Sequence, residues 1–258
     1  MASFTSNDES IFNTELIATV RLEIGEEVSN SLDDLHLQRF ITSNSSNLPK
    51  TVAQIRKWFV WWTALLPEEE DRGVTPCNIL QFDVKNTDCI LEYMKHSFMG
   101  VDREGHPIYW EKQGECSANF SKVKKQMSVD AMVNLHIRQE RLLDLCCAHQ
   151  TERLGKHVGK HIKIADMKGM SMVPDKNELD YIQRMIETDE DYFPDVMHRL
   201  IFINAPWYFP TLFNVMKVFM SEKVTSKITV HSTDFLPKLL EFMDSDQIPV
   251  CFGGTHEG

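Results

Sequence analysis

Side chains that could bind a ligand share one face of a strand predicted over residues 161–166. This segment (HIKIAD) alternates with a period of two, so His161, Lys163 and Ala165 point to the same side. A lysine on a buried strand face costs free energy unless it meets an anion. Lys163 therefore either reaches solvent along its flexible stem or lies in a pocket that receives an anionic group.

A second candidate is the segment 207–220, which is apolar on nearly every side. Its apolar residues are Trp207, Phe209, Leu212, Phe213, Val215, Met216, Val218, Phe219 and Met220, and Lys217 is its one charged residue. A helix of this kind must be buried or must face another apolar phase. The segment is therefore either a core helix or a lid over a lipid-like ligand.

The common motifs of catalysis are absent from the sequence. It contains no G-x-x-x-x-G-K-S/T, G-x-G-x-x-G, H-E-x-x-H or G-x-S-x-G string. The six cysteines form no C-x-x-C pair, and their spacing fits no zinc or disulfide framework. We therefore expect a binding protein rather than an enzyme, with no metal and no cofactor.

Composition limits the classes of partner. Hydrophobic residues make up 42% and charged residues 25%, with a formal net charge of −11. An acidic chain is a poor general binder of nucleic acid, because phosphates require a basic face. The longest apolar stretch, residues 58–66, is about half of what a membrane span needs, and no signal peptide is visible. We expect a cytoplasmic protein that is peripheral at membranes.

Local patterns predict the elements that position these candidates. Trp58, Trp61, Trp62 and Leu65 form the stripe of an amphipathic helix, which either packs on the following domain or contacts a membrane interface. Ser128 is an N-cap for a helix that reaches about residue 149. A small helical region over residues 1–75 therefore precedes a main domain over residues 76–258.

The order of elements in the main domain predicts the α/β class. Residues 175–178 have the character of a capping box and open a helix. Residues 200–204 read as a strand buried on both sides. Strand, helix and strand in this order predict a right-handed parallel crossover. Further helices over 210–220 and 236–243, with a strand over 227–231, complete the domain.

Four short strings together resemble the CRAL-TRIO lipid-transfer family, and its phosphatidylinositol/phosphatidylcholine transfer branch in particular. They are residues 101–109 (VDREGHPIY), 164–169 (IADMKG), 202–207 (FINAPW) and 248–255 (IPVCFGGT). The resemblance implies a mixed β-sheet as the floor of a pocket, with flanking helices and a gate helix. It also implies a monomer that binds a single lipid without catalysis and transfers or presents it at membranes.

The resemblance also assigns roles to residues. It makes the apolar segment the gate helix, with Phe209, Leu212, Phe213, Met216, Phe219 and Met220 facing the ligand. It places a phosphoinositide headgroup at Lys227, which would meet the phosphate, and at Asp195, which would accept an inositol hydroxyl. A threonine of the family pattern is replaced by Val224.

The choline-lipid site of the family is less well preserved. Its two small hydroxyl residues become His161 and Lys163, one tyrosine becomes Phe98, and Tyr109 is retained. These residues and Ala165 would form the pocket floor. We therefore expect an anionic glycerophospholipid such as phosphatidylinositol rather than phosphatidylcholine.

Two other functions remain open from the sequence. Some relatives of the fold resemble haem carriers, and His161 could ligate iron while Lys163 pairs with a propionate. A lone strand histidine is also compatible with a hydrogen-bonded core residue. The other alternative is a protein-interaction module that has lost its pocket.

Overall fold

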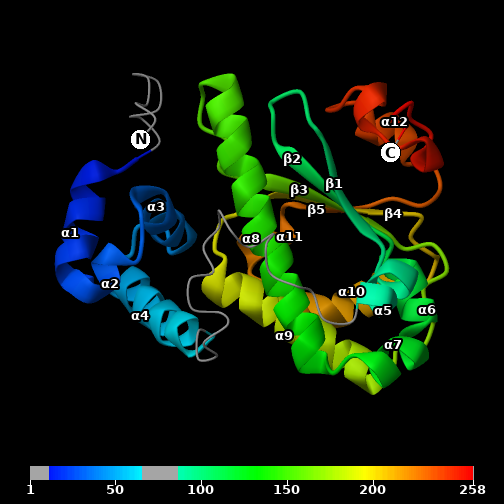
Figure 1. Ribbon diagram of the computed structural model, residues 1–258, viewed down its shortest axis with the longest axis horizontal. Helices are drawn as coiled ribbons and strands as arrows, with labels where there is room; N and C mark the ends of the chain where they lie inside the picture. The colour runs from blue at the N-terminus through cyan, green and yellow to red at the C-terminus, as the bar shows by residue number, and fades with distance from the viewer. Residues whose placement is uncertain (1–11, 66–86, 258) are drawn as a thin grey trace.

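Helices near the N-terminus lie to one side of an α/β unit (Figure 1). This computed structural model describes residues 12–65 and 87–257. The predicted boundary between residues 75 and 76 lies outside the described residues. Among the described residues, no helix has the length and apolarity needed to span a membrane.

The α-helices follow one another along the described chain from Thr14 to Leu239. They are α1 (Thr14–Ile24), α2 (Glu26–Asn30), α3 (Asp34–Ser43), α4 (Leu48–Leu65), α5 (Thr87–Tyr93), α6 (Gln113–Ala118), α7 (Phe120–Gln126), α8 (Val129–Leu154), α9 (Lys176–Tyr192), α10 (Phe209–Met216), α11 (Glu222–Thr225) and α12 (Leu236–Leu239). Short 3-10 turns cover Lys217–Phe219, Ser245–Gln247 and Val250–Phe252.

One mixed sheet of five strands organises the α/β unit, and its spatial order follows the chain order. The strands are β1 (His96–Val101), β2 (Pro107–Glu111), β3 (His161–Asp166), β4 (Met197–Ile203) and β5 (Ile228–Val230). β1 pairs with β2 antiparallel, whereas β2, β3, β4 and β5 pair in parallel. The predicted α/β class and the parallel crossover from β3 through α9 to β4 are confirmed.

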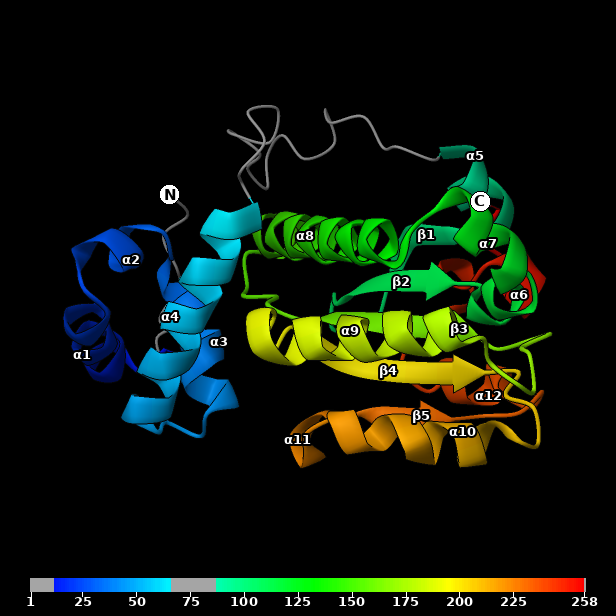
Figure 2. The ribbon, with the colours of Figure 1, turned by 90° about the horizontal axis from the view of Figure 1, so that it is seen from below.

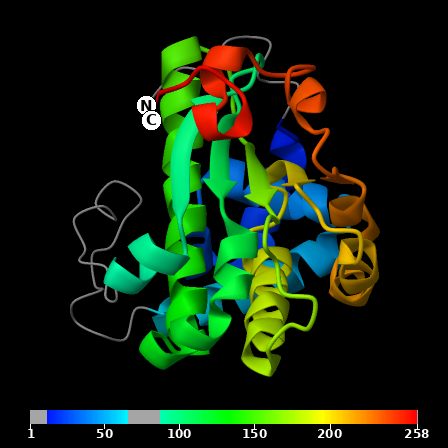
Figure 3. The same cartoon turned by 90° about the vertical axis from the view of Figure 1, so that its right-hand side faces the viewer.

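The two faces of the sheet are covered by different parts of the chain. On one face, Ile108, Ile162 and Ile201 pack with Leu239 and Phe252 from the C-terminal segment. The other face is covered by α8 and α9 (Figure 2). Figure 3 shows the C-terminal segment on the side of the sheet away from α9. Because strand side chains alternate, His161 and Lys163 face the helices.

The tryptophans of α4 pack inside the protein. Trp58 is buried in the core of the N-terminal helices. Trp61 stacks on Tyr192 at the end of α9, with 4.0 Å between the ring centroids. The packing interpretation of this stripe is therefore confirmed, and it joins the N-terminal helices to the α/β unit. The Leu65 side chain lies outside the described residues.

Capping residues set the starts of the two long helices as predicted. The Ser128 hydroxyl accepts a hydrogen bond from the backbone N–H of Ala131 (3.1 Å) at the start of α8. Asp175 and Glu178 form a complete capping box on α9. The C-terminal ends of helices were predicted less accurately, because α8 continues past residue 149 and α12 stops before residue 243.

Candidate functional site

A cavity of about 430 Å³ lies between the sheet, α9 and residues 207–225, which we call the α10–α11 segment. This volume is within the range of small-molecule sites. Many of the side chains that line it are apolar, among them Ile182, Met185, Ile186, Phe202, Phe209 and Met216. Charged residues also line it, and with their partners they form two groups, which we call the rim cluster and the floor cluster.

The rim cluster consists of Asp195 and three lysines. The Asp195 carboxylate lies 2.9 Å from the Lys160 Nζ, 3.1 Å from the Lys227 Nζ and 3.8 Å from the Lys223 Nζ. Lys227 also donates a hydrogen bond to the Met197 carbonyl oxygen (2.8 Å). Three ammonium groups around one carboxylate leave two uncompensated positive charges.

Geometry and charge hold Asp195 in place. Its side chain is 6% exposed, and its backbone adopts a left-handed conformation (φ 56°) that aspartate tolerates better than most residues. Burial raises the pKa of Asp195, but the neighbouring lysines outweigh it and keep the pKa below its usual value. Burial, Lys160 and Lys223 lower the pKa of Lys227 even though Asp195 opposes the shift. An anionic group would relieve this repulsion.

The floor cluster is built from β3, α8 and α9. The Lys163 Nζ forms an ion pair with Glu140 and lies 3.7 Å from the Asp189 carboxylate. His136 contacts the same carboxylate, with 2.6 Å between its Nε2 and Oδ1. The prediction that Lys163 awaits an anionic ligand is therefore wrong, because the protein itself supplies the anions.

Protonation in the floor cluster follows from burial and these pairs. Burial lowers the pKa of Lys163, but Glu140 and Asp189 outweigh it and raise the pKa above its usual value. Burial also raises the pKa of Asp189, but His136 and Lys163 bring it down to about 2. Burial raises the pKa of Glu140 more than Lys163 lowers it. Lys163 and Asp189 are thus ionised at neutral pH.

His161 lies beside the floor cluster and is only 1% exposed. Its Nε2 is 3.8 Å from the Glu140 carboxylate. Within the described part of the chain, neither ring nitrogen has a hydrogen-bond partner. Burial and the charge of Lys163 lower the pKa of His161 well below its usual value, so the ring is neutral and retains a donor and an acceptor.

The α10–α11 segment separates the cavity from solvent. Trp207 is 83% exposed and Val218 is 75% exposed, while Phe209 is fully buried. The core-helix interpretation of residues 207–220 is therefore wrong, because the outer side chains face solvent. Lys223 donates a hydrogen bond to the Thr42 carbonyl oxygen (2.9 Å), which ties the segment to α3.

Most of the residues assigned from the sequence meet at this cavity. Those that line it are Tyr109, His161, Lys163, Asp195, Phe209, Met216, Met220 and Lys227. Ala165, Leu212 and Phe213 instead belong to a cluster packed beside it. Phe98 packs on the Tyr109 ring without lining the cavity, and Phe219 is partly exposed.

Sequence reasoning missed five titratable residues of the two clusters. They are His136, Glu140, Lys160, Asp189 and Lys223. A weak signal existed on α8, because residues 136 and 140 are one helical turn apart and share a face. Lys160 and Lys223 offered none, since they converge on Asp195 from separate parts of the chain.

Residues 91–254 match the CRAL/TRIO domain family. The chain belongs to this family. At 29% identity it is similar to the phosphatidylinositol/phosphatidylcholine transfer protein SFH7 of Arabidopsis thaliana, covering 86% of this chain and 39% of that protein. It is 30% identical to the phosphatidylinositol/phosphatidylcholine transfer protein SFH12, also of Arabidopsis thaliana, covering 91% of this chain and 42% of that protein. The chain thus spans about two fifths of these relatives.

A shorter relative and a solved structure extend the comparison. The Sec14 cytosolic factor of Schizosaccharomyces pombe is 25% identical, covering 92% of this chain and 80% of that protein. The crystal structure of Sfh5 superposes with a TM-score of 0.64 at 14% identity, over 100% of this chain and 90% of that one. The structural likeness supports the fold that the resemblance implied.

Proposed function

We propose that this protein binds one lipid in the cavity and transfers it between membranes, or presents it there, without catalysis. The lipid class that the site favours is an anionic glycerophospholipid such as phosphatidylinositol. The observation that carries the proposal is a largely apolar cavity whose wall includes Asp195, Lys223 and Lys227, with Lys160 paired to the same carboxylate. The relatives named for phosphatidylinositol and phosphatidylcholine transfer support the lipid class.

Hydration of the acyl chains is the barrier that such a protein must avoid. Each methylene taken from water gains about 0.8 kcal/mol, so the roughly thirty methylenes of a diacyl lipid make desorption cost on the order of 20 kcal/mol. An apolar cavity offers the chains an environment similar to the bilayer. Methionines in its wall, such as Met185 and Met216, can adapt to a flexible chain.

The headgroup would lie at the rim cluster. Lys227 would bind the phosphate as a point charge, and Asp195 would accept a hydrogen bond from a headgroup hydroxyl. Lys223 lines the cavity beside them and would add a second positive charge. The floor cluster contains its own counter-ions, so it does not require a charged headgroup.

The outer face of the α10–α11 segment would contact the membrane during exchange. Trp207, Val215 and Val218 are exposed there. Tryptophan is favoured at the membrane interface. Opening would break the hydrogen bond between Lys223 and Thr42, so we expect the segment to detach from α3 when lipid enters.

Native mass spectrometry with organic extraction tests this function on protein purified from a eukaryotic host. A bound glycerophospholipid is expected. Vesicle exchange of phosphatidylinositol should then fall about tenfold or more in Lys227→Ala, because a hydrogen bond to a charged group contributes about 1.5–3 kcal/mol. Lys238→Ala, an exposed lysine outside the cavity, is the matched control. An unchanged rate in Lys227→Ala would refute the headgroup assignment.

A second candidate is a haem or another small hydrophobic ligand held at His161. One observation favours it: both buried ring nitrogens lack a hydrogen-bond partner among the described residues. The surroundings fit haem less well, because Glu140 lies next to the ring and already pairs with Lys163. An absorbance scan of the Soret region after haem-replete expression decides this, since colourless protein excludes haem.

A further inference from the structure

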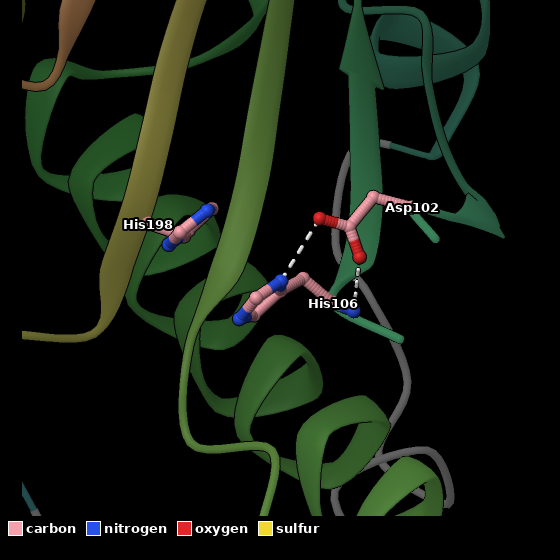
Figure 4. A group of neighbouring side chains, drawn as sticks. All are labelled: Asp102, His106 and His198. Atoms are coloured by element: carbon pink, nitrogen blue, oxygen red, sulfur yellow. Dashed lines mark hydrogen bonds and ion pairs between the residues drawn. The ribbon is translucent and has the colours of Figure 1, made fainter. Parts of the chain in front are cut away.

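A cluster of one carboxylate and two imidazoles lies on the face of the sheet opposite the cavity. Asp102 follows β1, His106 precedes β2, and His198 lies on β4 (Figure 4). Met197 lines the cavity, and the pairing of β3 with β4 shifts register directly after it. At this irregularity the His198 ring stacks on that of His106, while Arg199 lies over the Phe242 ring. None of the three residues lines the cavity, and the proposed lipid function makes no use of them.

Asp102 is held rigidly. Its Oδ1 accepts hydrogen bonds from the backbone N–H groups of Glu104 (3.0 Å) and His106 (2.7 Å). Its Oδ2 lies 2.9 Å from the His106 Nδ1. The Asp102 side chain is 4% exposed and that of His106 is 15% exposed. The pair is therefore preorganised, with one edge open to solvent.

His198 completes the cluster from β4, which is separated from β2 by β3. Its ring lies parallel to that of His106, with 4.0 Å between centroids and 9° between planes. One ligand atom from each of Asp102, His106 and His198 lies within 4.8 Å of the others. Among the described residues, no hydrogen bond involves the ring nitrogens of His198, so only packing holds the ring in this orientation.

We propose that Asp102, His106 and His198 bind a single divalent transition-metal ion, of which Zn²⁺ is the best match. Two imidazoles and one carboxylate are a known ligand set for zinc with an open fourth position. Two ligands at tetrahedral geometry around zinc lie roughly 3.3 Å apart. The Asp102 oxygen and the His106 nitrogen are already near that separation. Only His198 needs to rotate toward them.

The ion takes the place of a proton. In the metal-free state His106 donates the Nδ1 hydrogen to Asp102. Metal binding releases that proton, and the His106 Nδ1 and the Asp102 Oδ2 then both ligate the ion. Water supplies the fourth ligand from the exposed edge. The nearby positive side chains do not block entry, because Arg103 is drawn to Asp244 and Arg199 lies over the Phe242 ring.

The bound ion joins strands that otherwise meet only through β3. Asp102 and His106 bracket the turn between β1 and β2, while His198 belongs to β4. The ion would link this turn directly to β4. Because the ligands lie on the far face, the ion stabilises the sheet without entering the lipid cavity.

The test uses the full chain, first stripped with a chelator and then titrated with Zn²⁺ by calorimetry. Co²⁺ is titrated separately and followed by visible absorption. We expect one equivalent of either ion to bind. His198→Phe keeps the ring stacked on His106 but offers no ligand atom, so it should weaken binding at least tenfold and abolish the Co²⁺ band. His149→Ala, an exposed histidine on α8, is the control and should bind as the parent does.

Two results would overturn the site. One is a parent protein that binds neither ion. The other is His198→Phe binding Zn²⁺ as tightly as His149→Ala. Circular dichroism verifies that the variant is folded, and His198→Ala replaces it if the phenylalanine disturbs the fold. Phosphatidylinositol exchange should be the same in the parent and in His198→Phe, so failure of the metal site is distinguishable from failure of the lipid function.

Discussion

The rim cluster and the floor cluster use the same residue types in opposite proportions. At the rim, three lysines surround the single carboxylate of Asp195. At the floor, the single lysine Lys163 meets the carboxylates of Glu140 and Asp189, and His136 also contacts Asp189. The rim therefore carries excess positive charge, whereas the lysine at the floor is compensated by two carboxylates of the protein itself.

This difference indicates that the rim cluster suits a ligand, whereas the floor cluster connects parts of the fold. An uncompensated cation near water is stabilised by an incoming anion, so the rim suits an anionic headgroup. Lys163 already has its counter-ions, so it requires no further anion. Its ion pairs connect α8 and α9 with β3 instead. Lysines at 163 and 227 look alike in the sequence, but only their partners decide which one is available to a ligand.

The largest effect is expected from removing the floor cation. Lys163→Met leaves the buried carboxylate of Glu140 without its lysine, and breaking a buried pair costs about 3–5 kcal/mol. The free energy of unfolding in urea should fall by that amount. Lys163→Met/Glu140→Leu, which removes both partners of the pair, should recover most of the loss. A single-variant cost below about 1 kcal/mol would show that the floor cluster is not structural.

The next effect concerns the carboxylate of the rim. Asp195→Asn keeps the shape but removes the charge that orients Lys227 and accepts the headgroup hydroxyl. Phosphatidylinositol exchange should fall about tenfold, the equivalent of about 1.4 kcal/mol. An increase in exchange would mean that Asp195 merely neutralises the lysines. Urea unfolding of the same variant separates lost binding from lost stability.

Acid should weaken the floor cluster in a defined window. Asp189 has a pKa of about 2 in the folded protein, below its value of about 3.9 in an unfolded chain. Its contribution to stability is complete above the unfolded value and is lost as the pH falls through the folded value. Since a third of the side chain is exposed, solvent screening reduces the contribution to about 1 kcal/mol. Asp189→Asn should reduce the change of the unfolding free energy with pH between about pH 4 and pH 2. The same pH dependence in parent and variant would contradict the assignment.

The smallest expected effect is a difference in salt dependence between the rim cluster and the floor cluster. The Lys223 side chain is 43% exposed, and exposed charges are screened within a Debye length of about 8 Å at physiological ionic strength. Phosphatidylinositol binding should weaken a few-fold between about 0.05 and 0.5 M NaCl. The stability difference between the parent and Lys163→Met should remain constant over this range. A salt-independent affinity would argue against headgroup binding at the rim.

Local sequence patterns determined the elements and the faces that they present. The alternation in residues 161–166 placed His161 and Lys163 on the same side of β3, and the caps at Ser128 and Asp175 marked the starts of α8 and α9. These features depend on neighbours only a few residues away, so periodicity and capping chemistry are enough to predict them.

Only the tertiary structure decided which charges meet. Glu140 comes from α8 and Asp189 from α9, and both approach Lys163 because the two helices cover the same face of the sheet. Lys160 and Lys227 meet at Asp195 because β3 and β5 flank β4 and begin at the same edge. An ion pair between distant segments leaves no periodic trace in the sequence. Its partners are fixed by how whole helices and strands pack, which is why a lysine predicted to await an anion already has one.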